Sequence, residues 1–148
     1  MTFFIGSDHA GWELKEQLKD ALASEGHALI DVSEPVFTPD DDYPIIASRL
    51  AEHMAQSPET KGLLLCGSGQ GILIAVNRFP HMRVAFAGSA EHVRLAKSDE
   101  DVNGLALPAH TLTLAHALEM IHLWLDTPFR NTARDQRRMA QLSHLPGL

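Results

Sequence analysis

The single cysteine of the chain lies beside three glycines, in the stretch LLLCGSGQGI at 63–72. Gly67, Gly69 and Gly71 allow the backbone to approach a bound group closely and to present several N–H groups to it. If a helix begins here, these N–H groups are unpaired and the helix dipole is positive. Such a loop stabilises an anion and favours the thiolate form of a neighbouring cysteine. Cys66 is therefore either a reactive thiol or a small core residue that ends an apolar strand.

The spacing of the glycines does not fit three familiar phosphate-binding loops. A Walker loop needs a lysine directly after Gly71, and a dinucleotide fingerprint needs a glycine where the chain has Ile72. A cysteine phosphatase needs an arginine at that same place to hold the phosphate. The loop is thus predicted to bind an anion, or to stabilise one formed during a reaction, in some other way.

A second polar turn, GSDHAG, carries Asp8 and His9 directly after the apolar run TFFIG. A carboxylate beside an imidazole can hold a polyol by hydrogen bonds or transfer protons. Asp8 could equally be a helix N-cap, and this role alone would account for an aspartate here.

The C-terminal stretch FRNTARDQRRMAQL contains four of the twelve basic residues: Arg130, Arg134, Arg137 and Arg138. Their spacing predicts that they share one face of a helix. Guanidinium groups suit phosphate, although a solvated cationic face is the simpler alternative. The histidines near this end are six residues apart, so they do not share a helical face and no metal site is predicted.

Apolar runs of strand length alternate with amphipathic stretches of helical period. The predicted strands are 2–6, 27–32, 61–66, 83–86 and 104–107. The predicted helices are 7–26, 44–56, a segment after Gly71, 89–97, 111–125 and a polar helix from about 131. This alternation predicts an α/β fold, a three-layer doubly wound (Rossmann-like) parallel sheet of about five strands. Ligands bind beyond the carboxyl ends of such strands, so Cys66, Asp8 and His9 should face one crevice.

The composition is that of one folded domain over residues 1–148, with 45% hydrophobic and 21% charged residues. A net charge of -7 argues against a general nucleic-acid binder. One cysteine cannot form an intramolecular disulfide, which fits a reducing compartment. The sequence shows no secretory signal and no apolar run near the roughly 20 residues that span a membrane. We therefore expect a cytoplasmic protein without membrane or nucleic-acid partners.

SDHAG at 7–11, DYP at 42–44, CGSGQGI at 66–72, AVN at 75–77 and the terminal arginines together resemble one family. It is the family of type-B ribose-5-phosphate isomerases and galactose-6-phosphate isomerases, and the likeness covers almost the whole chain. The resemblance implies cofactor-free interconversion of an aldose phosphate and a ketose phosphate. It also implies a homodimer or homotetramer with active sites at the subunit interface and a C-terminal helix that reaches a partner subunit.

The resemblance assigns a role to each matched position. Cys66 corresponds to the base that removes a proton from the carbon next to the carbonyl. The loop formed by Gly67, Ser68, Gly69 and Gly71 corresponds to the anion hole for the resulting enediolate. The positions that match substrate-binding residues are Asp8, His9, Tyr43, Arg134 and Arg138.

Four positions depart from the family pattern. Asp99 takes the place of the histidine that opens the sugar ring, and Glu100 that of a substrate-binding asparagine. His110 takes the place of a phosphate-binding arginine, and Asp135 that of a histidine. A free aspartate is ionised at neutral pH, so Asp99 is a weaker proton donor than histidine unless its surroundings change it. These departures keep two alternatives open: a different sugar or sugar phosphate, or a non-catalytic sugar-phosphate-binding subunit.

Topology adds a prediction that does not depend on the family. The segment SDEDVN at 98–103 leads from a helix into a strand and lies at the amino ends of the strands, whereas Cys66 lies at the carboxyl ends. Within one chain the two are therefore far apart. Asp99 can act on a substrate bound at Cys66 only if it comes from a neighbouring subunit.

Overall fold

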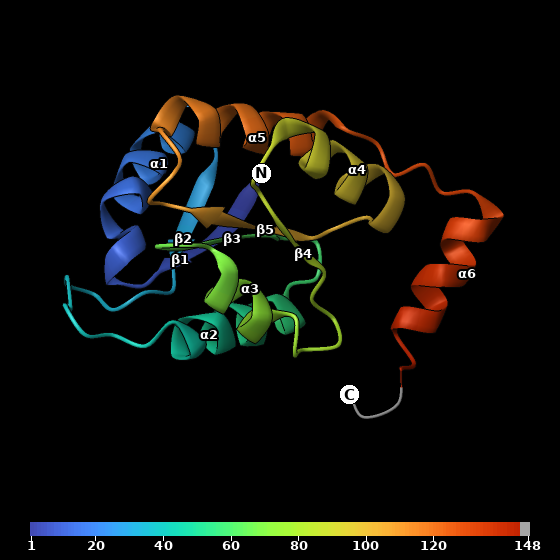
Figure 1. Ribbon diagram of the computed structural model, residues 1–148, viewed down its shortest axis with the longest axis horizontal. Helices are drawn as coiled ribbons and strands as arrows, with labels where there is room; N and C mark the ends of the chain where they lie inside the picture. Colours follow the sequence, from blue (N-terminus) through green and yellow to red (C-terminus); the bar gives the residue numbers. More distant parts are fainter. Residues whose placement is uncertain (146–148) are drawn as a thin grey trace.

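The computed structural model describes residues 1–145; residues 146–148, which the predicted single domain includes, lie outside the described residues. Its centre is a parallel sheet of five strands in the order β2-β1-β3-β5-β4 (Figure 1). The strands are β1 (Thr2–Ser7), β2 (Ala28–Asp31), β3 (Lys61–Cys66), β4 (Val84–Phe86) and β5 (Gly104–Pro108). The prediction of an α/β fold with about five parallel strands is confirmed.

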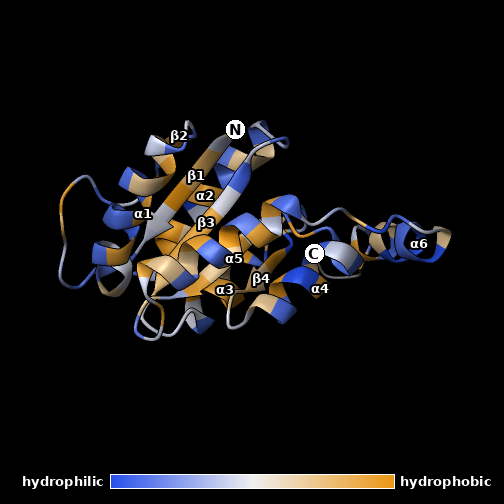
Figure 2. Ribbon diagram, turned by 90° about the horizontal axis from the view of Figure 1, so that it is seen from above, coloured by the Kyte–Doolittle hydropathy of each residue, from blue (hydrophilic) through white to orange (hydrophobic). Residues whose placement is uncertain are grey.

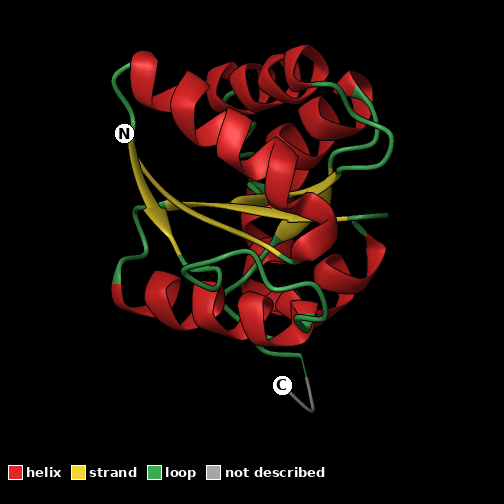
Figure 3. Cartoon of the chain, turned by 90° about the vertical axis from the view of Figure 1, so that its left-hand side faces the viewer, coloured by secondary structure: helices red, strands yellow, loops and turns green. Residues whose placement is uncertain are grey.

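Helices cover both faces of the sheet and form the two outer layers (Figure 3). One face is covered by α1 (Trp12–Ser24), α4 (Ala90–Glu100) and α5 (Leu114–Asp126). The other face is covered by α2 (Tyr43–Gln56) and α3 (Gln70–Val76). The last helix, α6 (Ala133–Leu142), belongs to neither layer and extends away from the sheet (Figures 1 and 2).

The central strand β3 is apolar throughout because both of its faces are buried. Leu63 and Leu65 pack with α1, α4 and α5, whereas Leu64 and Cys66 pack with α2 and α3. Successive side chains of a strand point to opposite faces, so this alternation follows directly from the strand geometry. It places the cysteine at the carboxyl end of β3, on the side of α2 and α3.

Capping residues fix helix starts that the apolar periodicity alone placed too early. Asp8 caps a short 3-10 turn, η1 (His9–Gly11), before α1 begins. Thr113 accepts the N–H of His116, so α5 begins at Leu114 rather than at 111. Beyond the end of α1, Gly26 has a φ of +85°, which suits the predicted helix-terminating glycine.

The predicted arginine face is wrong for Arg130. Thr132 and Asp135 form a capping box, so α6 begins at Ala133 and Arg130 precedes it. The Arg130 side chain instead donates from Nε and Nη2 to the two carboxylate oxygens of Asp135, at 2.9 and 2.7 Å. The remaining arginines, Arg134, Arg137 and Arg138, lie on α6 and are exposed.

Candidate active site

Cys66 ends β3 with its side chain almost fully buried, at 4% exposure. Its Sγ lies 3.2 Å from the backbone nitrogen of Gly69, and this N–H donates to the sulfur. A buried cysteine in a purely apolar site would lack such a contact. An N–H directed at the sulfur instead stabilises negative charge on it, as a base or nucleophile requires.

The glycine loop after Cys66 is held between two rings. A Cβ atom at Gly67 would lie 2.6 Å from Cε1 of His110, and one at Gly71 would lie 2.8 Å from Cζ of Tyr43. A side chain at either position would have to displace the facing ring. Gly69 has a φ of +74°, which returns its N–H towards Cys66. The structure thus brings Tyr43 and His110, two predicted site residues, to the loop.

The partial positive charge beside Cys66 comes mainly from the backbone N–H groups of the loop, and less from the dipole of the helix that follows. Helix α3 contains 7 residues, so its dipole is short. Ser68 is exposed, and its Oγ accepts the N–H of Gln70 at 3.3 Å. Backbone N–H groups of the loop between Gly67 and Gly71, rather than the dipole of α3, are thus the donors available to an anion here.

Asp8 lies at the same edge of the sheet as Cys66, because its N–H donates to the carbonyl of Leu65 at 3.3 Å. Its carboxylate accepts the N–H groups of Ala10 and Gly11, so the N-cap role of Asp8 is real. Burial raises the pKa of Asp8, although these backbone hydrogen bonds oppose the rise.

His9 is held by a residue that sequence reasoning did not single out. Both its backbone nitrogen and its ring Nδ1 lie within hydrogen-bond distance of Oδ1 of Asp41, at 2.7 and 3.0 Å. This hydrogen bond with Asp41 raises the pKa of His9, and the charge of Asp8 adds to the effect. The one sequence signal for Asp41 is the run of acids at 40–42 directly before the DYP motif.

Asp99 and Glu100 lie at the opposite end of the sheet from Cys66. Gly104, which follows them, pairs with Gly62, whereas Cys66 pairs with Pro108. These two pairs lie four residue steps apart along the strands, or about 13 Å at ~3.3 Å per residue. The Asp99 carboxylate accepts from Ser98 Oγ at 2.5 Å and lies 3.2 Å from Nη1 of Arg130. The carboxylate of Asp99 is therefore occupied by contacts within its own chain.

The terminal arginines are also not brought to Cys66 within one chain. Arg134 and Arg138 lie on the projecting helix α6 and are exposed (Figure 2). Asp135, which stands where the family has a histidine, is buried and accepts from Arg130 and Thr132. Arg130 and Thr132 hold the pKa of the Asp135 carboxyl well below its usual value. Asp135 therefore anchors the start of α6.

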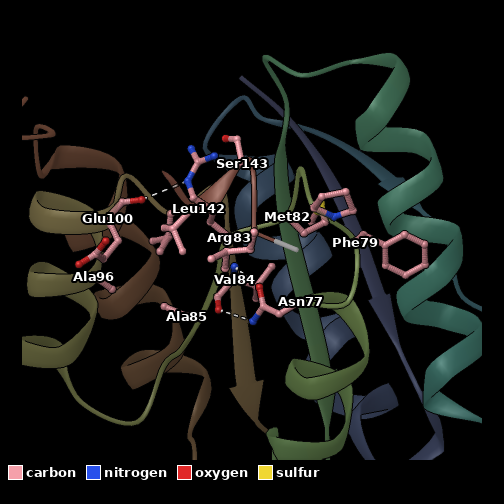
Figure 4. Close-up of a pocket in the computed structure, with 13 residues that line it drawn as sticks. Asn77, Phe79, Met82, Arg83, Val84, Ala85, Ala96, Glu100, Leu142 and Ser143 are labelled. Atoms are coloured by element: carbon pink, nitrogen blue, oxygen red, sulfur yellow. Dashed lines mark hydrogen bonds between the residues drawn. The ribbon is translucent and has the colours of Figure 1, made fainter. Parts of the chain in front are cut away.

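A cavity of about 420 Å³ lies at the amino ends of β4 and β5 (Figure 4). Arg83 precedes β4 and donates from Nε to the backbone carbonyl of Glu100, and Asn77 donates to the carbonyl of Val84. Leu142 closes the cavity from the end of α6. Of the predicted site residues, Glu100 alone lines this cavity. The cavity is therefore distinct from the edge of the sheet that carries Cys66.

Membrane-spanning helices and metal-binding clusters are both absent from residues 1–145. No helix in this part of the chain is long and apolar enough to cross a membrane. These residues also contain no group of three or more His, Cys, Asp and Glu side chains arranged to hold a metal ion.

Comparison with known proteins gives a consistent result over almost the whole chain. The family described as Ribose/Galactose Isomerase matches residues 3–142. A ribose-5-phosphate isomerase B of Mycolicibacterium paratuberculosis is 36% identical over 139 residues, which is 94% of this chain and 87% of that protein. A protein of the same name from Mycobacterium tuberculosis is 34% identical over 139 residues, again 94% of this chain and 86% of that protein.

Solved structures agree with the sequence comparison. A ribose 5-phosphate isomerase from Thermotoga maritima has a TM-score of 0.89 at 32% identity, covering 97% of this chain and 98% of that one. Ribose-5-phosphate isomerase B from Mycoplasma genitalium with bound ribulose-5-phosphate has a TM-score of 0.89 at 27% identity, covering 96% of this chain and 93% of that one. With the cysteine–glycine loop, Asp8 and His9 assembled at one edge of the same sheet, the chain belongs to the ribose/galactose isomerase family.

Proposed function

We propose that this chain interconverts an aldose phosphate and a ketose phosphate, with ribose 5-phosphate and ribulose 5-phosphate as the substrate pair. The observation that carries the proposal is the N–H of Gly69 directed at Cys66 Sγ, at the edge where Tyr43 and His110 flank the loop. Family membership supports the reaction type, and the names of the similar proteins support the substrate.

In the proposed mechanism Cys66 is the base. Its thiolate removes the proton from C2 of the open-chain aldose, which leaves an enediolate and a neutral thiol. Backbone N–H groups between Gly67 and Gly71 hold the negative charge, which exists only along the reaction path. The thiol then returns the proton to C1, while O1 gains a proton and O2 loses one, and the ketose results. No cofactor enters this balance.

The substrate is proposed to lie between groups of two subunits. Asp8, His9, Tyr43, Ser68 and His110 would line it from one chain. The groups at the amino end of the sheet and on α6 would come from the neighbouring chain of a homodimer or homotetramer: Asp99 as the acid that opens the ring, Glu100 beside the sugar, and Arg134 and Arg138 at the phosphate. The separation of these two sets along the sheet supports this arrangement.

Proton exchange tests the reaction directly. The protein is incubated with pentose, tetrose and hexose phosphates in deuterated water, and label at the carbon next to the carbonyl is measured by NMR. We expect exchange with ribose 5-phosphate, and a loss of at least about 10³-fold in C66A because the base is gone. C66S is the matched variant, since it keeps a small polar side chain that is a much weaker base. Absence of exchange on every phosphate would contradict the proposal.

A second candidate is an isomerase for a different sugar or sugar phosphate. It is favoured by the contacts of Asp99 with Ser98 and Arg130 of its own chain, and by His110 in place of an arginine. Inorganic phosphate separates a phosphorylated substrate from an uncharged sugar, because it competes only with the former. The panel of sugar phosphates separates one phosphorylated substrate from another. Tight binding of a sugar phosphate without exchange, even for open-chain substrates, would instead indicate a non-catalytic binding subunit.

A further inference from the structure

The loop between β2 and α2 holds His9 through a single carboxylate. Oδ1 of Asp41 accepts the backbone N–H of His9 at 2.7 Å and lies 3.0 Å from its ring Nδ1. The Asp41 side chain is 7% exposed, whereas the His9 side chain is 44% exposed. A nearly buried carboxylate therefore fixes an accessible imidazole at two points, the backbone and the ring.

The bond to Nδ1 determines what the rest of the ring can do. A carboxylate beside Nδ1 selects the form in which this nitrogen carries its proton, and leaves Nε2 for another partner. Within residues 1–145, no hydrogen bond to His9 Nε2 is formed. His9 also adjoins Asp8, on the edge that carries Cys66.

The charges around His9 all favour its protonated form. They are the carboxylates of Asp8, on its own turn, and of Asp40 and Asp41, on the loop packed against it. The hydrogen bond from Asp41 makes the largest contribution to the raised pKa of His9. Because the pKa is raised, the imidazolium persists to higher pH, and in this form Nε2 also carries a proton that it can donate.

We propose that Asp41 is a positioning residue, which orients the His9 ring so that Nε2–H is presented to an oxygen of the bound sugar phosphate. This inference rests on the proposed function, because it assumes that a sugar phosphate binds at the Cys66 edge. Within the acidic run at 40–42 it assigns a role to Asp41, which the sequence alone did not indicate. Asp41 itself does not touch the substrate, and its effect passes through His9.

The ring titration of His9 tests the contact without any substrate. The resonances of His9 are assigned by comparison with H9Q, and its titration is followed by NMR in the wild type, D41N and D40N. D41N keeps the size of the side chain but removes its charge; D40N removes the same charge from the neighbouring residue, which makes no bond to His9. We expect D41N to lower the pKa of His9 clearly more than D40N does, and to reduce the fraction of neutral His9 protonated at Nδ1.

Kinetics test the positioning. We expect D41A to raise KM for the sugar phosphate about tenfold, the usual cost of losing one charge-assisted hydrogen bond, while kcat changes less than about twofold. D41N, which keeps an acceptor oxygen, should recover part of this loss at low pH. Because D41N lowers the pKa of His9, the alkaline fall of kcat/KM should move to lower pH. Melting temperatures confirm that the variants are folded.

Each outcome bears on one claim. Equal titration shifts in D41N and D40N would overturn the specific contact, since loop charge alone would explain them. A clear titration shift with unchanged KM in D41A would overturn the positioning role. Absence of proton exchange in the wild type contradicts the proposed function instead, and leaves the titration result to be judged by itself.

Discussion

At the scale of single residues, the proposed mechanism requires a sulfur that is buried in the core and also acts as a base. Cys66 packs among the side chains of the α2 and α3 layer, and at the same time accepts the N–H of Gly69. Burial protects a thiol from adventitious reaction, whereas the N–H contact favours charge on it. The buried position fits a core residue, and the N–H contact fits a reactive thiol. The two roles are therefore distinguished by measuring the reactivity of Cys66.

Alkylation of Cys66 should inactivate the enzyme with one adduct per chain, because the sequence contains one cysteine. Only free enzyme can react, so a sugar phosphate at ten times its dissociation constant should slow alkylation by iodoacetamide about tenfold. Mass spectrometry measures the adduct, and loss of activity should follow it in proportion. C66A, which should form no adduct, is the control. Full labelling with full activity would remove Cys66 from the mechanism.

At the scale of elements, an ion-pair cluster ties the edge strand β2 to helix α1. Asp31, on β2, lies 2.7 Å from Nζ of Lys15 and 2.8 Å from Nζ of Lys19. The Lys15 side chain is fully buried, and its Nζ also lies 3.8 Å from the centre of the Trp12 ring. Because β2 leads into the loop that carries Asp41, this cluster fixes the start of that loop as well.

Asp31 should stabilise the fold in a pH-dependent manner. Its pKa is lowered to about 2, because the hydrogen bonds from Lys15 and Lys19 outweigh the cost of burial. A depressed pKa gives stability that is present above the unfolded value of 3.8 and is lost as the pH falls through about 2. We therefore expect D31N to lower the free energy of unfolding by about 2 kcal/mol at pH 7. Urea denaturation measures this difference.

Two comparisons make the Asp31 prediction specific. D20N removes the same charge from an exposed position of α1 and should change the stability by less than about 0.5 kcal/mol. The difference between the wild type and D31N should also disappear as the pH approaches 2. A difference that stays constant with pH would indicate lost packing rather than the ionised carboxylate.

At the scale of the whole molecule, the parallel sheet separates the predicted site into two groups. Cys66, its loop, Asp8 and His9 lie at the carboxyl edge, whereas Asp99 lies at the amino edge and the terminal arginines lie on the projecting helix α6 (Figure 1). No change of side-chain rotamer can bridge this separation. If all these residues act on one substrate, a second chain must supply half of them.

Mixing two inactive variants tests the shared site. C66A lacks the proposed base, and R134A/R138A lacks the proposed phosphate-binding arginines. After subunit exchange about half of the dimers should be hybrids, each with one complete site, so about a quarter of the wild-type activity should return. Each variant exchanged with itself is the control. Hybrids detected by native mass spectrometry without recovered activity would contradict a site shared between subunits.

The sequence by itself determined the layers of the fold and the groups at the carboxyl edge. Apolar runs and amphipathic periods predict the five parallel strands, because both faces of such a sheet must be buried. The places of Cys66 and Asp8 follow from the same rule, since Cys66 ends β3 and Asp8 directly follows the end of β1. Helix starts such as those of α5 and α6 were placed too early, because capping side chains, and not hydrophobic period, determine them.

Tertiary structure alone decided the contacts between residues that are distant along the chain. Asp41 meets His9 across 32 residues, and Asp31 meets the buried Lys15 across 16, because β2 returns the chain beside β1. Periodicity reports the face on which a side chain lies, but not the partner that it meets there. The sequence therefore specified which groups lie at the ends of the strands. The tertiary packing determined that Asp41 contacts His9 and that Asp31 contacts Lys15.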